Sequence, residues 1–123
     1  MKLKEEEFDE LVDQALKEIP GEFLEKLENI QIIIEDQPSY QMLQDLGLRM
    51  GDILFGLYQG TPRPERSFFQ GVSQPDHIVL FRRSILRYCR TKREIKNQIR
   101  KTLVHEIAHY FGFSEDHLAR LGY

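Results

Sequence analysis

Two histidines one helical turn apart, with a glutamate between them, are the residues of this chain best suited to chemistry. The stretch His105-Glu106-Ile107-Ala108-His109 is an HExxH motif. On a helix, His105 and His109 share one face, and both imidazoles can reach one zinc ion at about 2.0–2.1 Å. Glu106 is rotated from His105 by about 100°. It can therefore lie beside the metal and accept a proton from metal-bound water instead of binding the metal.

A solvent-exposed histidine pair on an ordinary amphipathic helix is the alternative interpretation. At about 100° per residue, the apolar side chains of this stretch form one arc, and His105 and His109 fall outside it. The arc comprises Ile95, Ile99, Leu103, Val104, Ile107 and Phe111. The two histidines are therefore not predicted to be core residues. A cofacial pair beside the core is what an open metal site requires, so metal binding is favoured.

The residues after the motif supply candidates for a third protein ligand. Gly112 stands three residues after His109 and allows the chain to reverse direction directly after the helix. The segment that follows is then brought back toward the metal. Its candidate ligands are Glu115, Asp116 and His117.

The helix that must carry the motif is predicted at residues 91–112. Thr91 and Glu94 form a capping box at its start, and Gly112 is typical of the position just after a helix ends. A final short helix is expected from Ser114 to Leu121.

The rest of the chain predicts a single α+β domain over residues 1–123, with helices around a small mixed sheet. An amphipathic helix ending at Pro20-Gly21 is indicated by apolar residues at helical spacing. These residues are Phe8, Leu11, Val12, Ala15, Leu16 and Ile19. Short helical segments are expected through Leu24 and Leu27 and at residues 40–47. Strands are expected at 30–35, with the composition of a buried strand, at 52–60 and at 77–85, and a proline-rich loop at 61–75.

Composition limits the class of protein. With 123 residues, 41% hydrophobic and 30% charged, the chain is expected to be one globular domain. A formal net charge of −3 predicts no global attraction to nucleic acid or to an anionic membrane. Cys89 is the only cysteine, which excludes an internal disulfide and a cysteine-rich zinc cluster. We expect it to be buried.

The start of the chain has acids where a signal peptide needs an apolar run. No stretch approaches the roughly 18 apolar residues of a membrane span. We therefore expect a cytoplasmic protein.

Charge is unevenly distributed along the chain. Residues 1–29 hold ten acids and four bases, whereas residues 82–101 hold nine bases and one acid. The favoured interpretation is two solvated helix faces that attract each other or the rest of the fold. A phosphate-binding strip is the alternative, but Tyr88 is the only aromatic residue interleaved with these bases.

The stretch from His105 to the end resembles the minimal zincins, small bacterial zincin-like metallopeptidases with the pattern HExxHxxGxxD. Further segments are similar to successive landmarks of this family, in the same order. They are "IIIEDQPS" (32–39), "LFGLYQGTP" (54–62), "ERS" (65–67) and "PDHIVLFRRSI" (75–85). The resemblance implies a compact α+β fold, one zinc ion per chain and hydrolysis of a peptide or protein substrate.

Matched position by position, the resemblance implies a role for each motif residue. His105 and His109 match the two histidine ligands, Glu106 the general base and Gly112 the turn. The third ligand departs from the pattern, because Glu115 stands where the family has aspartate. Its neighbour Asp116 is therefore a competing ligand, and His117 is expected to be a surface residue.

Weaker candidates surround these residues. A zincin needs a second electrophile near the metal, and the candidates are Tyr58, Arg63, Arg66 and Tyr123. Tyr110 lies four residues after Glu106 and could orient it, but it also fits the apolar arc and is expected to pack in the core. An extended peptide is expected to pair with an exposed strand edge, for which residues 77–81 are the candidate.

Our leading hypothesis is a zinc metallopeptidase in which Glu106 activates a metal-bound water. The rival is a non-catalytic metal-binding interaction module. Coordination by both Glu115 and Asp116 would close the site and favour this rival, because catalysis needs an open position. A nucleic-acid binder using residues 82–101 is the third class.

Overall fold

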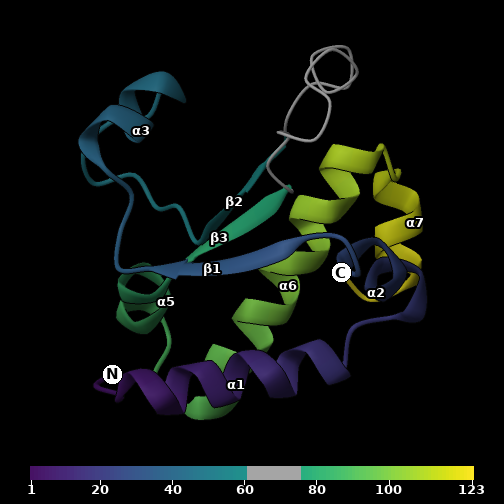
Figure 1. The fold of residues 1–123 in the computed structure, drawn as a ribbon, viewed down its shortest axis with the longest axis horizontal. Helices are drawn as coiled ribbons and strands as arrows, with labels where there is room; N and C mark the ends of the chain where they lie inside the picture. The colour runs from purple at the N-terminus through teal and green to yellow at the C-terminus, as the bar shows by residue number, and fades with distance from the viewer. Residues whose placement is uncertain (61–75) are drawn as a thin grey trace.

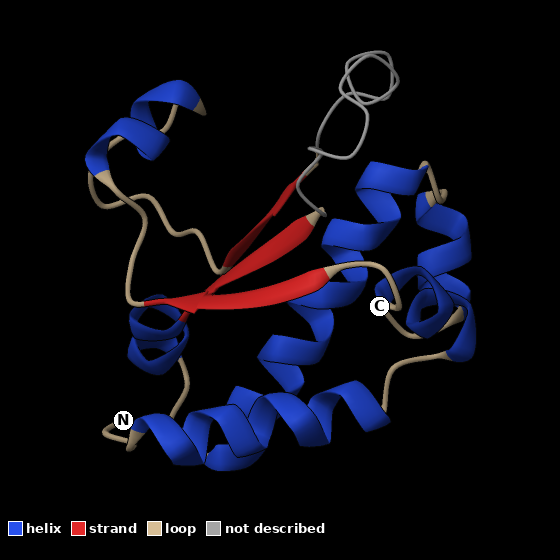
Figure 2. Ribbon diagram, in the orientation of Figure 1, coloured by secondary structure: helices blue, strands red, loops and turns tan. Residues whose placement is uncertain are grey.

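The computed structural model describes residues 1–60 and 76–123. Its elements follow in the order α1 (Glu5–Lys17), α2 (Gly21–Leu27), β1 (Gln31–Glu35), α3 (Tyr40–Asp45), β2 (Gly56–Gln59), β3 (His77–Phe81), α5 (Arg82–Tyr88), α6 (Lys92–Phe111) and α7 (Glu115–Arg120). Helices surround a small sheet, as Figures 1 and 2 show. The predicted α+β class with a mixed sheet is confirmed. The loop expected at 61–75 lies outside the described residues.

The three strands form a mixed sheet in the order β1-β3-β2. β3 is parallel to β1 and antiparallel to β2, with Val79 opposite Ile33 on one side and opposite Leu57 on the other. The prediction that residues 77–81 offer an exposed edge is therefore wrong. Four of these five residues are buried, as a central strand requires. Among the residues that the structure describes, β1 and β2 are the outer strands of the sheet.

Helix α6 crosses the sheet and contacts β2, β3 and the helices α1, α2 and α5. It packs against α1 near its start and against α2 near its end (Figure 1). Its contact with β2 is close, because a Cβ atom on Gly56 would lie 2.6 Å from Cγ2 of Thr102. Glycine at this position therefore lets the strand lie directly against the helix that carries the HExxH motif.

Both ends of α6 have the predicted caps. The Thr91 hydroxyl accepts a hydrogen bond from the Glu94 amide, and the Glu94 side chain accepts one from the Thr91 amide. Gly112 adopts a left-handed conformation with φ of 78°. Helix α7 then starts from Ser114, whose hydroxyl accepts a hydrogen bond from the amide of His117.

Three strand predictions need correction. The strand expected at 52–60 begins only at Gly56, and the one expected at 77–85 ends at Phe81, where α5 begins. Phe81, Ile85 and Cys89 are all buried at a spacing of four, which is a helical pattern. The three isoleucines of β1 are only half-buried, because this strand lies at an edge.

The acidic and basic segments attract each other, as expected. Lys92 and Lys96 on α6 pair with Glu7 and Glu18 at 3.2 and 3.3 Å. Cys89 is buried as predicted, and this burial raises the pKa of its thiol. Within residues 1–60 and 76–123, no helix has the length and apolar character of a membrane span.

Candidate functional site

The two motif histidines project from the last turns of α6, outside the buried arc. His105 is half-buried and His109 is exposed, whereas Leu103, Val104 and Ile107 are fully buried. The imidazole rings are 5.9 Å apart between centroids. The prediction that these histidines are not core residues is confirmed.

The turn at Gly112 brings one carboxylate back to the motif. The amide of Phe113 donates to the carbonyl of Ala108 at 2.8 Å, which closes the reversal after α6. Oε1 of Glu115 then lies 3.6 Å from Nε2 of His109. Two ligands on one tetrahedral zinc ion lie roughly 3.4 Å apart. The separation of His109 and Glu115 is therefore close to that of two ligands of the same ion.

The other two third-ligand candidates are placed differently. Asp116 is exposed in the first turn of α7. The ring of His117 is held by Glu22 of α2 at 2.8 Å and packs edge-on against Phe113. His117 is thus half-buried instead of lying freely on the surface, and it contacts α2.

The donor set fits zinc, although the side chains have not converged. In the described part of the chain, no three His, Cys, Asp or Glu residues form a group that could hold a metal ion. His109 and Glu115 form a pair, and His105 lies apart from it. The side chains of His109 and Glu115 are 59% and 78% exposed, so surrounding residues do not bury either of them. Two imidazoles and one carboxylate are also an ordinary ligand set for catalytic zinc.

Glu106 is held by the edge of the sheet. Its Oε1 accepts a hydrogen bond of 2.8 Å from the backbone N–H of Tyr58 in β2. The amide of Phe81 donates to the carbonyl of Phe55, directly before β2, so these two residues form a hydrogen-bonded pair. Such pairs alternate along an antiparallel ladder with pairs that are not hydrogen-bonded. Tyr58 belongs to the second kind, and its N–H therefore lies on the side of β2 that faces away from β3. The contact joins residues 48 apart in sequence, and no sequence signal pointed to it.

Aromatic side chains cover the end of β2 beside Glu106. The ring of Tyr58 stacks on that of Tyr110 with centroids 3.9 Å apart. Gly60 makes room for this stack, because a Cβ atom there would lie 2.7 Å from the Tyr110 hydroxyl. Tyr110 is 44% exposed, so its predicted core position is wrong. Phe111, 36% exposed, also departs from the buried arc, because the last turn of α6 extends beyond the core.

The candidate electrophiles have different neighbours. The hydroxyl of Tyr58 donates to Asp76 at 2.6 Å. Tyr123 packs under the guanidinium of Arg100, and burial raises the pKa of its phenol. Arg63 and Arg66 lie outside the described residues. Tyr58 is the candidate that contacts Glu106, through its backbone.

A cleft leads along α6 to the motif. It has a volume of about 390 Å³ and lies between the segment 53–56 and α6. Its walls are Ile53, Leu54, Phe55 and Gly56 on one side and Gln98, Lys101, Thr102, His105 and Glu106 on the other. The structure thus places a motif histidine and the glutamate in one open cleft beside an edge strand.

Comparison with known proteins identifies a family and a similar fold. A family model described as zincin-like metallopeptidase matches residues 27–123. A conserved hypothetical protein from Thermo thermophilus has a similar solved structure, with a TM-score of 0.55 and 22% identity. The alignment covers 89% of this chain and 94% of that one, and it supports the fold. No curated protein matches the chain significantly.

Proposed function

Because this chain belongs to the zincin-like metallopeptidase family, we propose that it is a zinc-dependent peptidase with Glu106 as its general base. The observation that carries the proposal is the placement of Glu106. Its carboxylate lies in an open cleft, is fixed by the Tyr58 amide and shares the cleft wall with His105. A general base must be positioned in this way before it can act.

The metal would be held by His105, His109 and one carboxylate after the turn. Glu115 is the favoured third ligand, because it already lies 3.6 Å from His109. Asp116 is the alternative. A zinc ion bound here would polarise the substrate carbonyl and lower the pKa of water.

The protein's own contribution is to hold and move one proton. The Tyr58 amide binds Oε1 of Glu106, which leaves Oε2 to take the proton of the attacking water. The same carboxyl group can then deliver that proton to the departing amine. Because the N–H of Tyr58 is part of the backbone, this orientation does not depend on a second flexible side chain.

A non-catalytic metal-binding module is the second candidate. It is favoured by the adjacent carboxylates of Glu115 and Asp116, both exposed in the first turn of α7. If both bound the ion together with His105 and His109, four protein ligands would fill the tetrahedral positions.

The substitution Glu106→Gln separates the two candidates. Glutamine keeps the size and the hydrogen-bond acceptor but cannot take up a proton. We expect zinc content and folding to be nearly unchanged, and peptide cleavage to fall about 100-fold or more. Metal analysis and cleavage of a peptide library are measured on both proteins in parallel. Loss of zinc would assign Glu106 a structural role. Wild-type protein that holds zinc but cleaves no peptide would favour the module.

A further inference from the structure

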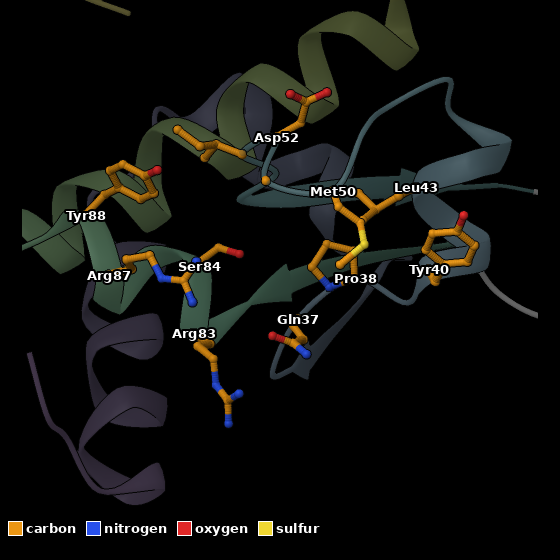
Figure 3. Close-up of a pocket in the computed structure, with 12 residues that line it drawn as sticks. Gln37, Pro38, Tyr40, Leu43, Met50, Asp52, Arg83, Ser84, Arg87 and Tyr88 are labelled. Atoms are coloured by element: carbon orange, nitrogen blue, oxygen red, sulfur yellow. The ribbon is translucent and has the colours of Figure 1, made fainter.

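A second cavity, of about 350 Å³, lies beside helix α5 (Figure 3). One wall is formed by Arg83, Ser84, Arg87 and Tyr88 of this helix. The other is formed by α3 and the chain on both sides of it, including Pro38, Tyr40, Leu43, Met50 and Ile53. We call it the Arg87 cavity. None of its lining residues belongs to the HExxH motif or is a candidate ligand.

Large apolar side chains are exposed around this cavity. Tyr40, Met50, Ile53 and Tyr88 are 62%, 79%, 48% and 53% exposed. Apolar side chains gathered at one exposed place are typical of a binding surface. Tyrosine, methionine and arginine are also the residue types that are enriched at protein interfaces.

The polar groups of the cavity favour an anion. In Figure 3, Arg87 extends beside Ser84 toward the opposite wall, whereas Arg83 extends away from it. Asp52 is the acid among the lining residues, and its carboxylate accepts a hydrogen bond of 2.8 Å from the amide of Arg49. Figure 3 shows that carboxylate pointing away from Arg87. Arg87 therefore presents its positive charge next to an apolar wall.

The cavity adjoins the cleft that leads to the motif. Ile53 lines both, and the cleft continues past Lys101 to His105 and Glu106. The five residue steps from Ile53 to Tyr58, whose amide holds Glu106, span at most roughly 17 Å. A peptide of about five extended residues can therefore reach from Glu106 to the cavity.

We propose that the Arg87 cavity is a distal subsite that binds an acidic side chain and a neighbouring apolar side chain of the peptide substrate. The subsite would lie about five residues from the bond that is cleaved. That the bound molecule is a peptide rests on the proposed peptidase function. The net charge of the chain is −3, so attraction of an acidic peptide has to be local.

Binding of labelled peptides tests this subsite without any need for cleavage. Two fluorescein-labelled peptides of about twelve residues carry Glu-Leu-Glu at the amino or the carboxyl end of a Gly/Ser sequence. Each is compared with its Gln-Leu-Gln counterpart by fluorescence anisotropy, on the Glu106→Gln protein with zinc. At least one Glu peptide should bind about 2- to 5-fold more tightly than its Gln form, as expected for one exposed ion pair.

A matched pair of variants locates the effect. Arg87→Glu should remove the preference for the Glu peptide, whereas Arg120→Glu on α7 makes the same charge change away from the cavity and should retain it. Both residues are exposed, so folding should tolerate either change. Met50→Ser should weaken binding of the Glu and the Gln peptide alike, because it removes part of the apolar wall.

Several outcomes would overturn the subsite. One is equal binding of the Glu and Gln peptides to the protein. Another is an equal loss of the preference for the Glu peptide in Arg87→Glu and Arg120→Glu. A dimer that Arg87→Glu dissociates in sedimentation, with no peptide bound, would make a second copy the occupant. If the binding depends on Arg87 but the wild-type protein with zinc cleaves no peptide, the subsite stands and the proposed peptidase activity fails.

Discussion

The contact between Glu106 and the backbone of Tyr58 links the proposed catalytic residue to the sheet. Outward N–H groups of an edge strand are usually free to bind water or another strand. Here one of them holds Oε1 of Glu106 at 2.8 Å. A peptide that paired with β2 at Tyr58 would compete for this N–H. If the proposed peptide substrate paired there, its binding and the orientation of Glu106 would be coupled at this one residue.

The histidines can be tested by metal content. We expect His105→Ala and His109→Ala each to abolish binding of one zinc per chain, because two remaining ligands hold the ion poorly. His77→Ala is the control, since His77 bonds to Gln59 in the neighbouring strand. Zinc per chain is measured after dialysis. Full metal content in either motif variant would contradict the site.

The third ligand calls for paired variants of the two carboxylates. Glu115→Ala should weaken zinc affinity about 10-fold or more, because losing a direct ligand exceeds the loss of a supporting contact. Asp116→Ala should have a smaller effect. The double variant is needed as well, since either acid can partly replace the other. Competition with a chelator gives the affinities. A larger effect of Asp116→Ala would make Asp116 the ligand.

At the scale of elements, the sequence predicted the helix that carries the site better than the sheet. The capping box at Thr91, the apolar arc and Gly112 all act locally, so α6 could be predicted within one residue at each end. Helix α5 was not predicted, because the apolar start of the stretch 77–85 favoured one continuous strand. The central position of β3 depends on pairing between distant segments, which a single sequence does not contain.

For the site, too, local features were predictable from the sequence and contacts between distant segments were not. The histidine pair and the turn follow from residues close together in sequence. The hydrogen bond of Glu106 to Tyr58 and the stacking of Tyr58 on Tyr110 join α6 to a strand about fifty residues away. The last turn of α6 extends beyond the core, so helical periodicity alone wrongly assigned Tyr110 to the interior.

Gly112 allows a test of how the turn positions α7. Alanine at its φ of 78° is strained by about 1 kcal/mol. Gly112→Ala should therefore lower stability and, by displacing Glu115, also weaken zinc affinity. Gly47→Ala is a matched control, because Gly47 has φ of 73° and open space around its Cβ position, as Gly112 has.

Urea unfolding of the metal-free proteins and chelator competition measure the two effects. Both variants should lose similar stability, and only Gly112→Ala should lose zinc affinity. If Gly112→Ala bound zinc as tightly as wild type, the turn would not determine the position of the third ligand.

At the scale of the whole molecule, opposite charges join its first helix to the helix of the site. The pKa of Glu7 is lowered by the Lys4 amide and by Lys92, and the pKa of Asp36 is lowered by Arg82. A carboxyl group with a lowered pKa stabilises the fold above its ordinary value, and this contribution is lost as the pH falls through the lowered value. The ordinary values are 4.5 for Glu7 and 3.8 for Asp36. Stability should therefore fall on acidification below about pH 4.5.

Charge reversal on α6 tests this attraction directly. Lys92→Glu replaces the 3.2 Å pair with Glu7 by a repulsion, and it should lower the urea midpoint of metal-free protein slightly at pH 7. Lys101→Glu makes the same change where α6 faces the segment 53–56, and it should leave the midpoint nearly unchanged. The difference between the two variants should shrink in high salt, because salt screens exposed charges. It should also shrink near pH 3, where the carboxyl groups become protonated. Equal midpoints for the two variants at pH 7 and low salt would mean that the pair of Lys92 with Glu7 does not help to hold α1 against α6.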